Sequence, residues 1–173
     1  MCGWKSTMPS SVDIIGRSFF GALAMTSSDS YKFDIRAATS VSDFLFLRRL
    51  RNRVRDQMTN DTAPLGYLQQ LRFYVNQPPN VKVYIAWMSA KRAGYLLLRQ
   101  ESTGCFVTEA VDARFRKTGV ATRLVRYAQE RCADLTAEIL LTNTASIKLH
   151  QSTGFEFSGD DGRIAIYRFK RQP

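Results

Sequence analysis

The sequence predicts a single α/β domain in which strands and helices alternate along most of the chain. Apolar residues make up 45% of the 173 residues, which is enough for one core of ordinary size. Stretches rich in β-branched and aromatic residues alternate with stretches whose apolar residues recur every three or four positions. We expect the order β, α, α, β, β, β, α, β, α, β, β over residues 31–173. Residues 1–30, rich in Ser, Thr and Gly, are expected to be a flexible extension.

The first half of the chain contains three expected strands and two expected helices. Residues 31–38 alternate apolar and polar side chains and predict the first strand. The first helix has an apolar face made of Phe44, Leu47, Leu50, Val54 and Met58. Residues 60–64 separate it from a second helix, whose apolar residues are Leu65, Leu68, Leu71 and Val75. Residues 81–88 and 94–99 are strand-like, and the short polar segment between them predicts an antiparallel pair.

The second half of the chain alternates strands and helices before it ends in a hairpin. Residues 105–111 read as a strand, and a helix follows from residue 120 to near residue 132. Residues 138–142 predict another strand, and residues 146–152 another helix. The last two expected strands, residues 155–158 and 164–169, flank the sequence Gly-Asp-Asp-Gly, which is a turn signal.

The charge balance favours a negatively charged partner. Lys and Arg number 25 against 15 Asp and Glu, which gives a formal net charge of +10. A phosphorylated cofactor, a nucleotide-linked substrate or a nucleic acid would each suit this surplus. Positive charge that serves only solubility is the alternative.

The cysteine and histidine content argues against a metal site and against a disulfide framework. The three cysteines are odd in number and widely spaced, and the chain has one histidine. A reducing cytoplasm is the expected setting. No run of about 18 apolar residues exists, so we expect no membrane-spanning helix.

A basic turn that contains a glycine lies between an expected strand and an expected helix. The first amides of a helix have no intrahelical partner, and the helix end is positive, so such a turn suits a pyrophosphate. Glycine allows the backbone to approach anionic oxygens closely. The residues expected to bind the phosphates are Arg116, Lys117, Thr118, Gly119, Val120 and Ala121.

Two segments together resemble the signature of the GNAT N-acetyltransferase superfamily. Residues 111–121 fit its strand–turn–helix, with Arg or Gln followed by x-x-Gly-x-Gly/Ala, and residues 143–155 resemble its Asn-x-x-Ala-x-x-Leu-Tyr-x-x-x-Gly-Phe pattern. The resemblance implies a mixed, mostly antiparallel sheet with helices on both faces and a splayed central strand pair. It also implies acetyl-CoA as co-substrate, with the pantetheine arm lying along Glu109, Ala110 and Val111.

The second segment departs from the family pattern at two positions. Asn143, Leu149, Gly154 and Phe155 match, Ser146 replaces a small Ala, and His150 stands where many members have Tyr. Asn143 and Ser146 are expected beside the cofactor, and that Tyr protonates the departing thiolate in the family. An imidazolium is able to donate the same proton. Alternatively, neutral His150 only hydrogen-bonds the sulfur, or it packs the helix without a catalytic part.

A general base is needed because a primary amine is mostly protonated at neutral pH. Glu138 occupies the place of a catalytic Glu in family members that acetylate protein N-termini. Glu109 shares a strand face with Cys105 and Val107, from which family members often recruit a base. Each carboxylate is also readable as a solvated charge or as a partner for an arginine, so the sequence leaves the choice open.

The acceptor side is expected on the first two helices. The residues there that resemble the acceptor helix of members acting on nucleotide-linked amino sugars are Arg51, Asn52, Arg55 and Tyr74. Guanidinium groups bind phosphate in a bidentate fork, although a solvated basic face is the alternative. We therefore expect direct acetyl transfer, in a ternary complex, to the primary amine of a small phosphorylated or nucleotide-linked acceptor. An amine carried by a nucleic acid, such as aminoacyl-tRNA or a modified base, a catalytically silent acetyl-CoA-binding module, and a homodimer remain open.

Overall fold

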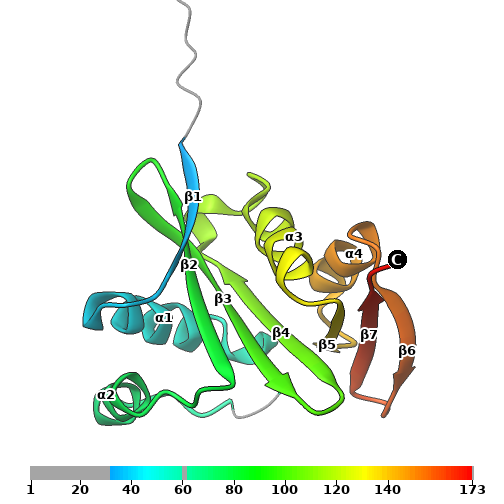
Figure 1. Cartoon of the computed structure of the whole chain (residues 1–173), viewed down its shortest axis with the longest axis horizontal. Helices are drawn as coiled ribbons and strands as arrows, with labels where there is room; N and C mark the ends of the chain where they lie inside the picture. The colour runs from blue at the N-terminus through cyan, green and yellow to red at the C-terminus, as the bar shows by residue number, and fades with distance from the viewer. Residues whose placement is uncertain (1–31, 60–61, 173) are drawn as a thin grey trace, which may run out of the picture. The chain divides into compact units, whose positions relative to one another are not determined.

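The computed structural model describes residues 32–59 and 62–172, so the expected extension over residues 1–30 lies outside the described residues. In the described part, seven strands form one sheet with the order β1-β2-β3-β4-β5-β7-β6 (Figure 1). The strands are β1 (Phe33–Ala37), β2 (Val81–Met88), β3 (Lys91–Glu101), β4 (Gly104–Val111), β5 (Asp134–Leu140), β6 (Glu156–Asp160) and β7 (Ile164–Lys170). The α-helices are α1 (Val41–Arg53), α2 (Tyr67–Val75), α3 (Val120–Arg131) and α4 (Thr144–Ser152), with 3₁₀ turns η1 (Arg55–Gln57) and η2 (Ala113–Phe115).

The sheet is mixed and mostly antiparallel, as the family resemblance implied. Strands β4 and β5 are parallel, and the other neighbouring strands in the sheet are antiparallel. A parallel pair needs a crossover, and α3 supplies it between β4 and β5.

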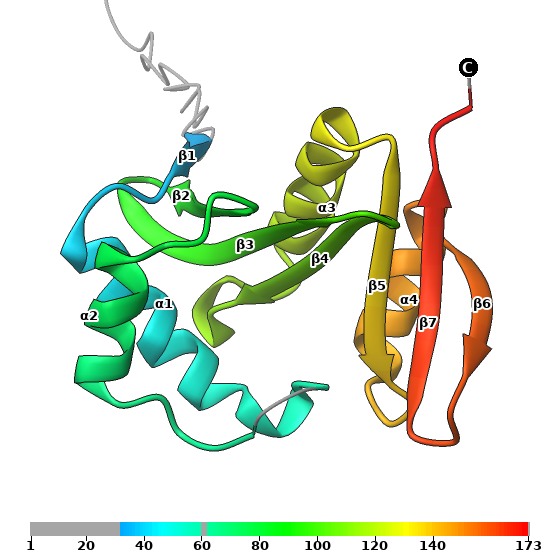
Figure 2. The ribbon, with the colours of Figure 1, turned by 60° about the horizontal axis from the view of Figure 1, so that its bottom comes forward.

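Strands β4 and β5 separate soon after they begin to pair. Their ladder consists of two residue pairs, Cys105 with Leu135 and Phe106 with Thr136. Beyond this point the strands diverge, and Figure 2 shows the gap between the sheet half that ends at β4 and the half that begins at β5. The expected splayed central pair is therefore present, and residues 107–111 have no ladder partner on the β5 side among the described residues.

Helices pack on both faces of the sheet because each has one apolar face. Residues such as Phe44, Leu47 and Leu50 of α1 are buried with Ile85 of β2 and form a core on one face. On the other face, α3 contributes the buried residues Val120, Leu124, Val125 and Ala128. Ile147 and Leu149 of α4 pack against this second core. Because α1 and α3 belong to different cores, they lie on opposite sides of β3 and β4 (Figure 1).

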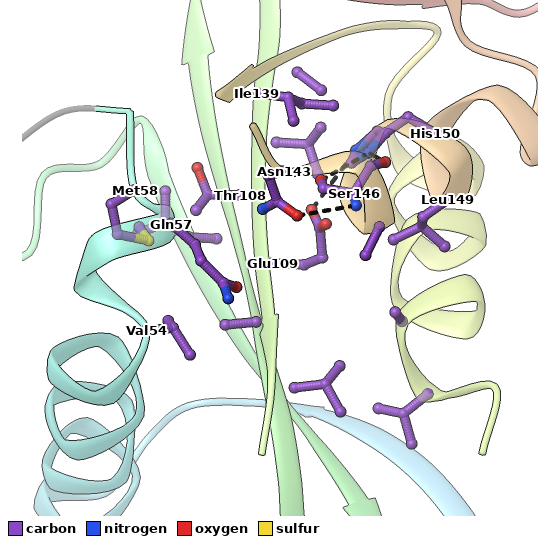
Figure 3. A pocket seen from close by; sticks show the side chains of 18 of the residues that line it. Val54, Gln57, Met58, Thr108, Glu109, Ile139, Asn143, Ser146, Leu149 and His150 are labelled. Atoms are coloured by element: carbon purple, nitrogen blue, oxygen red, sulfur yellow. Dashed lines mark hydrogen bonds and ion pairs between the residues drawn. The ribbon is translucent and has the colours of Figure 1, made fainter. Parts of the chain in front are cut away.

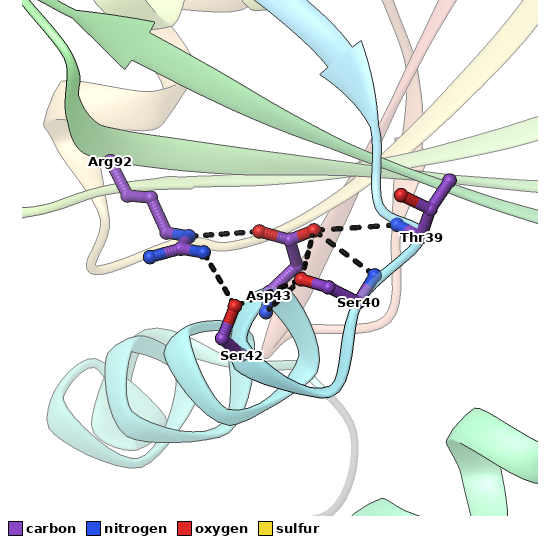
Figure 4. Close-up of polar contacts among 5 residues, drawn as sticks. All are labelled: Thr39, Ser40, Ser42, Asp43 and Arg92. Carbon is purple, nitrogen blue, oxygen red and sulfur yellow. Dashed lines mark hydrogen bonds and ion pairs between the residues drawn. The ribbon is translucent and has the colours of Figure 1, made fainter.

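A capping box fixes the start of α1 against β3. The hydroxyl of Ser40 accepts a bond from the Asp43 amide, and the Asp43 carboxylate accepts a bond from the Ser40 amide. Arg92 of β3 donates to the other Asp43 oxygen at 2.8 Å, as Figure 4 shows. Burial opposes the charge on Asp43, but the bonds from Ser40 and Arg92 outweigh it and lower the pKa of this carboxyl. The N-terminus of α1, and hence its direction along the sheet, is fixed by these contacts.

The element boundaries differ from the sequence expectations in places where polar residues obscure the pattern. Helix α1 ends at Arg53, and Arg55 lies in η1, so Arg51 and Arg55 do not share the helix face that their spacing suggested. Strand β5 begins at Asp134, four residues earlier than expected, because exposed Asp134 and half-buried Thr136 alternate with buried Leu135 and Ala137.

Candidate active site

A cavity of about 650 Å³ occupies the gap where β4 and β5 diverge. Residues from both strands, from the end of α1 with η1, from the turn before α3 and from α4 line it (Figure 3). Alternate residues of a strand point to opposite faces. Val107 of β4 packs on the α3 side, whereas Ala110 packs on the α1 side. The cavity therefore connects one face of the sheet with the other.

The turn before α3 has the conformation expected of an anion-binding loop. Gly119 is the N-cap of α3 with a φ of +82°, a region that suits glycine, and no side chain caps the helix. The first recorded helical bond runs from the Arg123 amide to the Gly119 carbonyl, so the preceding amides have no intrahelical partner. Of the six expected phosphate-binding residues, the structure places Arg116, Lys117, Gly119, Val120 and Ala121 on the cavity wall.

Thr118, the sixth expected residue, does not line the cavity. Its hydroxyl donates to the Phe115 carbonyl at 2.7 Å and so closes the turn from within. Ahead of it, Asp112 accepts bonds from the backbone amide and the guanidinium of Arg114. The Arg114 guanidinium lowers the pKa of the Asp112 carboxyl and keeps it charged. Both contacts hold the turn in shape, and the charge of Arg114 is compensated locally.

His150 of α4 is buried and has a defined tautomer. Its side chain is 2% exposed, and it packs edge-on against Phe155 with ring centroids 4.8 Å apart. Nδ1 lies 2.9 Å from the Ser146 carbonyl oxygen. A carbonyl oxygen only accepts, so Nδ1 carries a proton. Nε2 is buried without a hydrogen-bond partner in the described part of the chain.

Glu109 of β4 faces that second nitrogen. Its carboxylate oxygen Oε2 lies 3.7 Å from Nε2 of His150, and the Glu109 side chain is 9% exposed. Burial raises the pKa of the Glu109 carboxyl, while the charge of His150 opposes the rise. The structure brings together two residues that the sequence proposed for separate roles.

Asn143, Ser146 and Glu138 also reach the cavity. The Asn143 side-chain oxygen accepts from the Ser146 amide at 3.2 Å and caps α4, while Ser146 orients His150. Ala137 and Ile139 face the α3 side, so Glu138 points to the opposite face of β5. Glu138 therefore lies on the α1 side, apart from the Glu109–His150 pair.

Of the four residues named for the acceptor side, one lies on the cavity wall. Arg51 lines the cavity, and its guanidinium donates to the Ala63 carbonyl. Asn52 exchanges two hydrogen bonds with the Leu65 backbone and fixes the loop after η1. Arg55 is ion-paired with Asp56, and Tyr74 stacks edge-on with Phe44. The structure does not place Asn52, Arg55 or Tyr74 on the cavity wall.

Several cavity residues on the α1 side were not singled out from the sequence. They are Gln57, Leu97, Arg99, Phe106 and Thr108, whereas Val54 and Met58, which also line the cavity, were expected on the first helix. Strand alternation was the usable signal for Phe106 and Thr108, because they share a face with Ala110. The approach of η1 to β4 is a long-range contact, and no local pattern predicts it.

Comparison with known proteins assigns the family. Residues 47–155, more than half of the chain, match the Acetyltransferase (GNAT) family. The chain belongs to the GNAT acetyltransferase family. As a GNAT acetyltransferase it uses acetyl-CoA as its co-substrate. A search of curated protein sequences finds no match to it.

Solved structures share the GNAT fold at low sequence identity. A domain from Methanocaldococcus jannaschii is 18% identical, with a TM-score of 0.72 over 82% of this chain and 99% of that one. An N-acetyltransferase from Staphylococcus aureus is 20% identical, with a TM-score of 0.67 over 80% and 98%. The Salmonella typhimurium protein yncA, solved with its cofactor acetyl-CoA, is 17% identical, with a TM-score of 0.63 over 80% and 93%.

The residues of this GNAT chain fit acetyl-CoA. Unpartnered amides at the start of α3, beside Arg116 and Lys117, suit a diphosphate, and the open edge of β4 suits an extended amide-containing arm. No group of three or more His, Cys, Asp or Glu side chains with metal-binding geometry occurs among the described residues. None of the helices that the structure describes has the length and apolarity needed to cross a membrane.

Proposed function

We propose that this chain transfers an acetyl group from acetyl-CoA to the primary amine of a small phosphorylated or nucleotide-linked acceptor. The amine attacks the thioester directly in a ternary complex. The observation that carries this proposal is the buried Glu109–His150 pair, which lies in a cavity open to both faces of the sheet. Because the two ends of the cavity are on different faces, donor and acceptor are able to meet at the pair without sharing a binding surface.

The donor is held by the turn before α3 and by the edge of β4. Amides of Gly119, Val120 and Ala121 bind the diphosphate, and Arg116 and Lys117 add charge at the cavity wall. The backbone of Ala110 and Val111 lies on the strand edge along which the pantetheine arm would extend. The Asn143 and Ser146 side chains stand on the wall beside His150 and order the region of the sulfur.

The Glu109–His150 pair moves the protons that the reaction requires. An ammonium acceptor must lose one proton to become a nucleophile, and Glu109 accepts it because burial raises the pKa of this carboxyl. When the amide forms, its nitrogen loses a second proton. Nε2 of His150 relays this proton to the departing sulfur. One proton is released to solvent for each amide formed, so protons balance. The family's usual tyrosine acid is replaced here by this imidazole.

Glu138 remains the second candidate for the base. It lies on the α1 side of β5, where the acceptor enters, and it has no recorded partner among the described residues. An isosteric pair of variants separates the candidates. If Glu109 is the base, Glu109→Gln lowers kcat strongly while Glu138→Gln changes mainly the acceptor KM, and the reverse result assigns the base to Glu138.

The acceptor proposal rests on the positive charges at the α1 end of the cavity, where Arg51 and Arg99 both line the wall. Guanidinium groups suit phosphate oxygens.

Because Cys105 and Cys132 are free thiols, we also propose a reducing compartment, the cytoplasm, as the site of action.

A coenzyme A release assay tests the function. The panel contains amino sugar nucleotides, amino sugar phosphates, polyamines, peptides and aminoacyl-tRNA, each run with acetyl-CoA and with mass analysis of the product. Acetylation of a phosphorylated small amine supports the proposal. Transfer confined to aminoacyl-tRNA supports the nucleic-acid alternative, and tight acetyl-CoA binding without turnover on the whole panel contradicts N-acetyl transfer.

A further inference from the structure

We propose that Arg99 determines acceptor specificity by binding an anionic group held at a fixed distance from the reacting amine. This inference rests on the proposed function and adds the residue that recognises the anion and the span that the acceptor must bridge. Arg99 belongs to β3, lines the cavity, and was not among the residues that the sequence pointed to.

The β3–β4 register fixes the position of Arg99 relative to the catalytic pair. Arg99 pairs with Phe106, and Glu109 lies three residues further along β4. At about 3.4 Å per residue, the backbones of Phe106 and Glu109 are roughly 10 Å apart along the strand. Glu109 shares the α3-side face of Val107, whereas Arg99 shares the α1-side face of Leu97. An acceptor that places its amine at Glu109 and an anion at Arg99 must therefore pass through the gap beside β4 and bridge at least about this length.

The surface between the two ends is largely apolar. Leu97 pairs with Thr108, and this pair lies between the Arg99–Phe106 pair and Glu109. Met58 and Val54 line the same cavity from η1 and the end of α1 (Figure 3). Thr108 contributes one hydroxyl and Gln57 one amide to this stretch. The acceptor portion between amine and anion is therefore expected to be a slim, mainly apolar linker or ring.

The Arg99 guanidinium is held at Nε, whereas its terminal amino groups are open to a ligand. Its carbon Cζ lies 5.0 Å from the centroid of the Phe106 ring, and Nε is ion-paired with Glu101 at 2.8 Å. Neither terminal amino group has a recorded hydrogen bond within residues 32–59 and 62–172. The side chain is 42% exposed, so solvent and ligand both reach it. A guanidinium that is held at one edge and open at the other is suited to bidentate phosphate or carboxylate binding.

The other cations of the cavity are less suited to this task. Arg116 and Lys117 belong to the donor turn on the α3 side. Arg51 is buried and its guanidinium donates to the Ala63 carbonyl, so it contributes a positive field more than an accessible fork. Arg99 is therefore the cation that selects the acceptor.

The test uses two matched pairs of amines with the full-length protein and acetyl-CoA. The long pair is 6-aminohexyl phosphate and 6-aminohexan-1-ol, and the short pair is 2-aminoethyl phosphate and 2-aminoethanol. We expect kcat/KM to favour the long phosphate over its alcohol by about tenfold, the scale of one charge-assisted hydrogen bond. In the short pair, we expect the phosphate and the alcohol to have the same kcat/KM. Arg99→Ala should abolish the long-pair preference through KM, with kcat for the alcohol retained.

Three further variants separate recognition from structure. Arg99→Lys keeps the charge without the fork and should give an intermediate preference. Glu101→Gln releases the guanidinium and should increase the preference for the long phosphate. Arg36→Ala removes an exposed arginine that is ion-paired with Asp34 on β1, outside the cavity wall, and should change nothing.

The outcomes for the inference and for the function differ. If the wild-type protein acetylates the amines without a phosphate preference, or if Arg99→Ala keeps the preference, the inference is wrong while N-acetyl transfer stands. An equal preference in the short pair also contradicts the 10 Å span. If acetyl-CoA binds but none of the four amines is acetylated, the role proposed for Arg99 is wrong. If no amine of the wider panel is acetylated either, the proposed function is wrong as well.

Discussion

The most informative perturbation is a double-mutant cycle on Glu109 and His150. At 3.7 Å, opposite unit charges interact by about 4 kcal/mol when the effective dielectric constant is about 20. Glu109→Gln is isosteric and removes the titrating oxygen. His150→Asn keeps a donor for the Ser146 carbonyl, which the imidazole bonds at 2.9 Å, but lacks the nitrogen that faces Glu109. Glu109→Gln therefore preserves the packing of α4, whereas His150→Asn also removes the ring contact with Phe155, so its melting temperature is measured beside its kcat.

If the pair handles protons as one unit, each single variant should lower kcat by about 10²–10⁴, the usual contribution of general acid–base catalysis. This corresponds to roughly 3–5 kcal/mol, and the double variant should lose little more than either single variant. The coupling energy should then be a few kcal/mol, in line with the Coulomb estimate. The KM for acetyl-CoA should change little, because neither residue belongs to the turn before α3.

The assay is initial-rate release of coenzyme A with the acceptor that the amine panel identifies, over pH 5.5–9 for all four proteins. If Glu109 and His150 act independently, the fold-loss of kcat in the double variant equals the product of the two single losses. That result would refute a proton-handling unit made of the two residues. Retention of kcat by His150→Asn would assign His150 a packing role. Because the chain has one histidine, its ring nitrogens can also be observed directly by NMR, and a proton on Nδ1 is expected.

Three further predictions concern stability and donor binding. Gly119→Ala should cost about 1 kcal/mol of unfolding free energy and raise the KM for acetyl-CoA, because φ is +82° there; Gly66→Ala, at a φ of −72° with open space, is the control, and equal urea midpoints would contradict this. Burial raises the pKa of Glu109, so wild-type stability falls as pH rises from the ordinary value through the folded one. The melting temperature of Glu109→Gln minus that of the wild type should therefore increase as pH rises. A difference that stays constant with pH would contradict the raised pKa. Asp112→Asn should loosen the donor turn, raise the KM for acetyl-CoA, and destabilise the protein at neutral pH. That destabilisation should vanish as pH falls through the lowered pKa of Asp112, and an undiminished difference in acid would show that the charge is not responsible.

The donor side of the site could be predicted from the sequence because its signals are local. The turn, its glycine and the helix that follows lie within a few consecutive residues, and the structure places Arg116, Lys117 and Gly119 on the cavity wall. Thr118 differs because its hydroxyl serves the turn itself. His150 and Glu109 were each identified from position, but their contact depends on how α4 packs beside the divergent strands, which sequence spacing does not contain.

The acceptor side could not be predicted in the same way. The regular spacing of Arg51 and Arg55 suggested one continuous helix, yet α1 ends at Arg53 and the chain turns into η1. Asn52 resembled a substrate ligand but bonds the Leu65 backbone. Arg99 reaches the cavity wall through its register with Phe106 across a hairpin, which no local pattern indicates. Local motifs therefore specify the donor end, whereas tertiary contacts specify the acceptor end.

The two-pair ladder between β4 and β5 leaves most of the β4 edge open to a ligand. A ligand that bridges the open strand edge binds the native chain and not the unfolded one, so it raises the unfolding free energy by RT ln(1 + [L]/Kd). At about a hundred times Kd this amounts to nearly 3 kcal/mol. The concentration of thioester around the enzyme thus contributes to its resistance to proteolysis as well as to its rate of turnover.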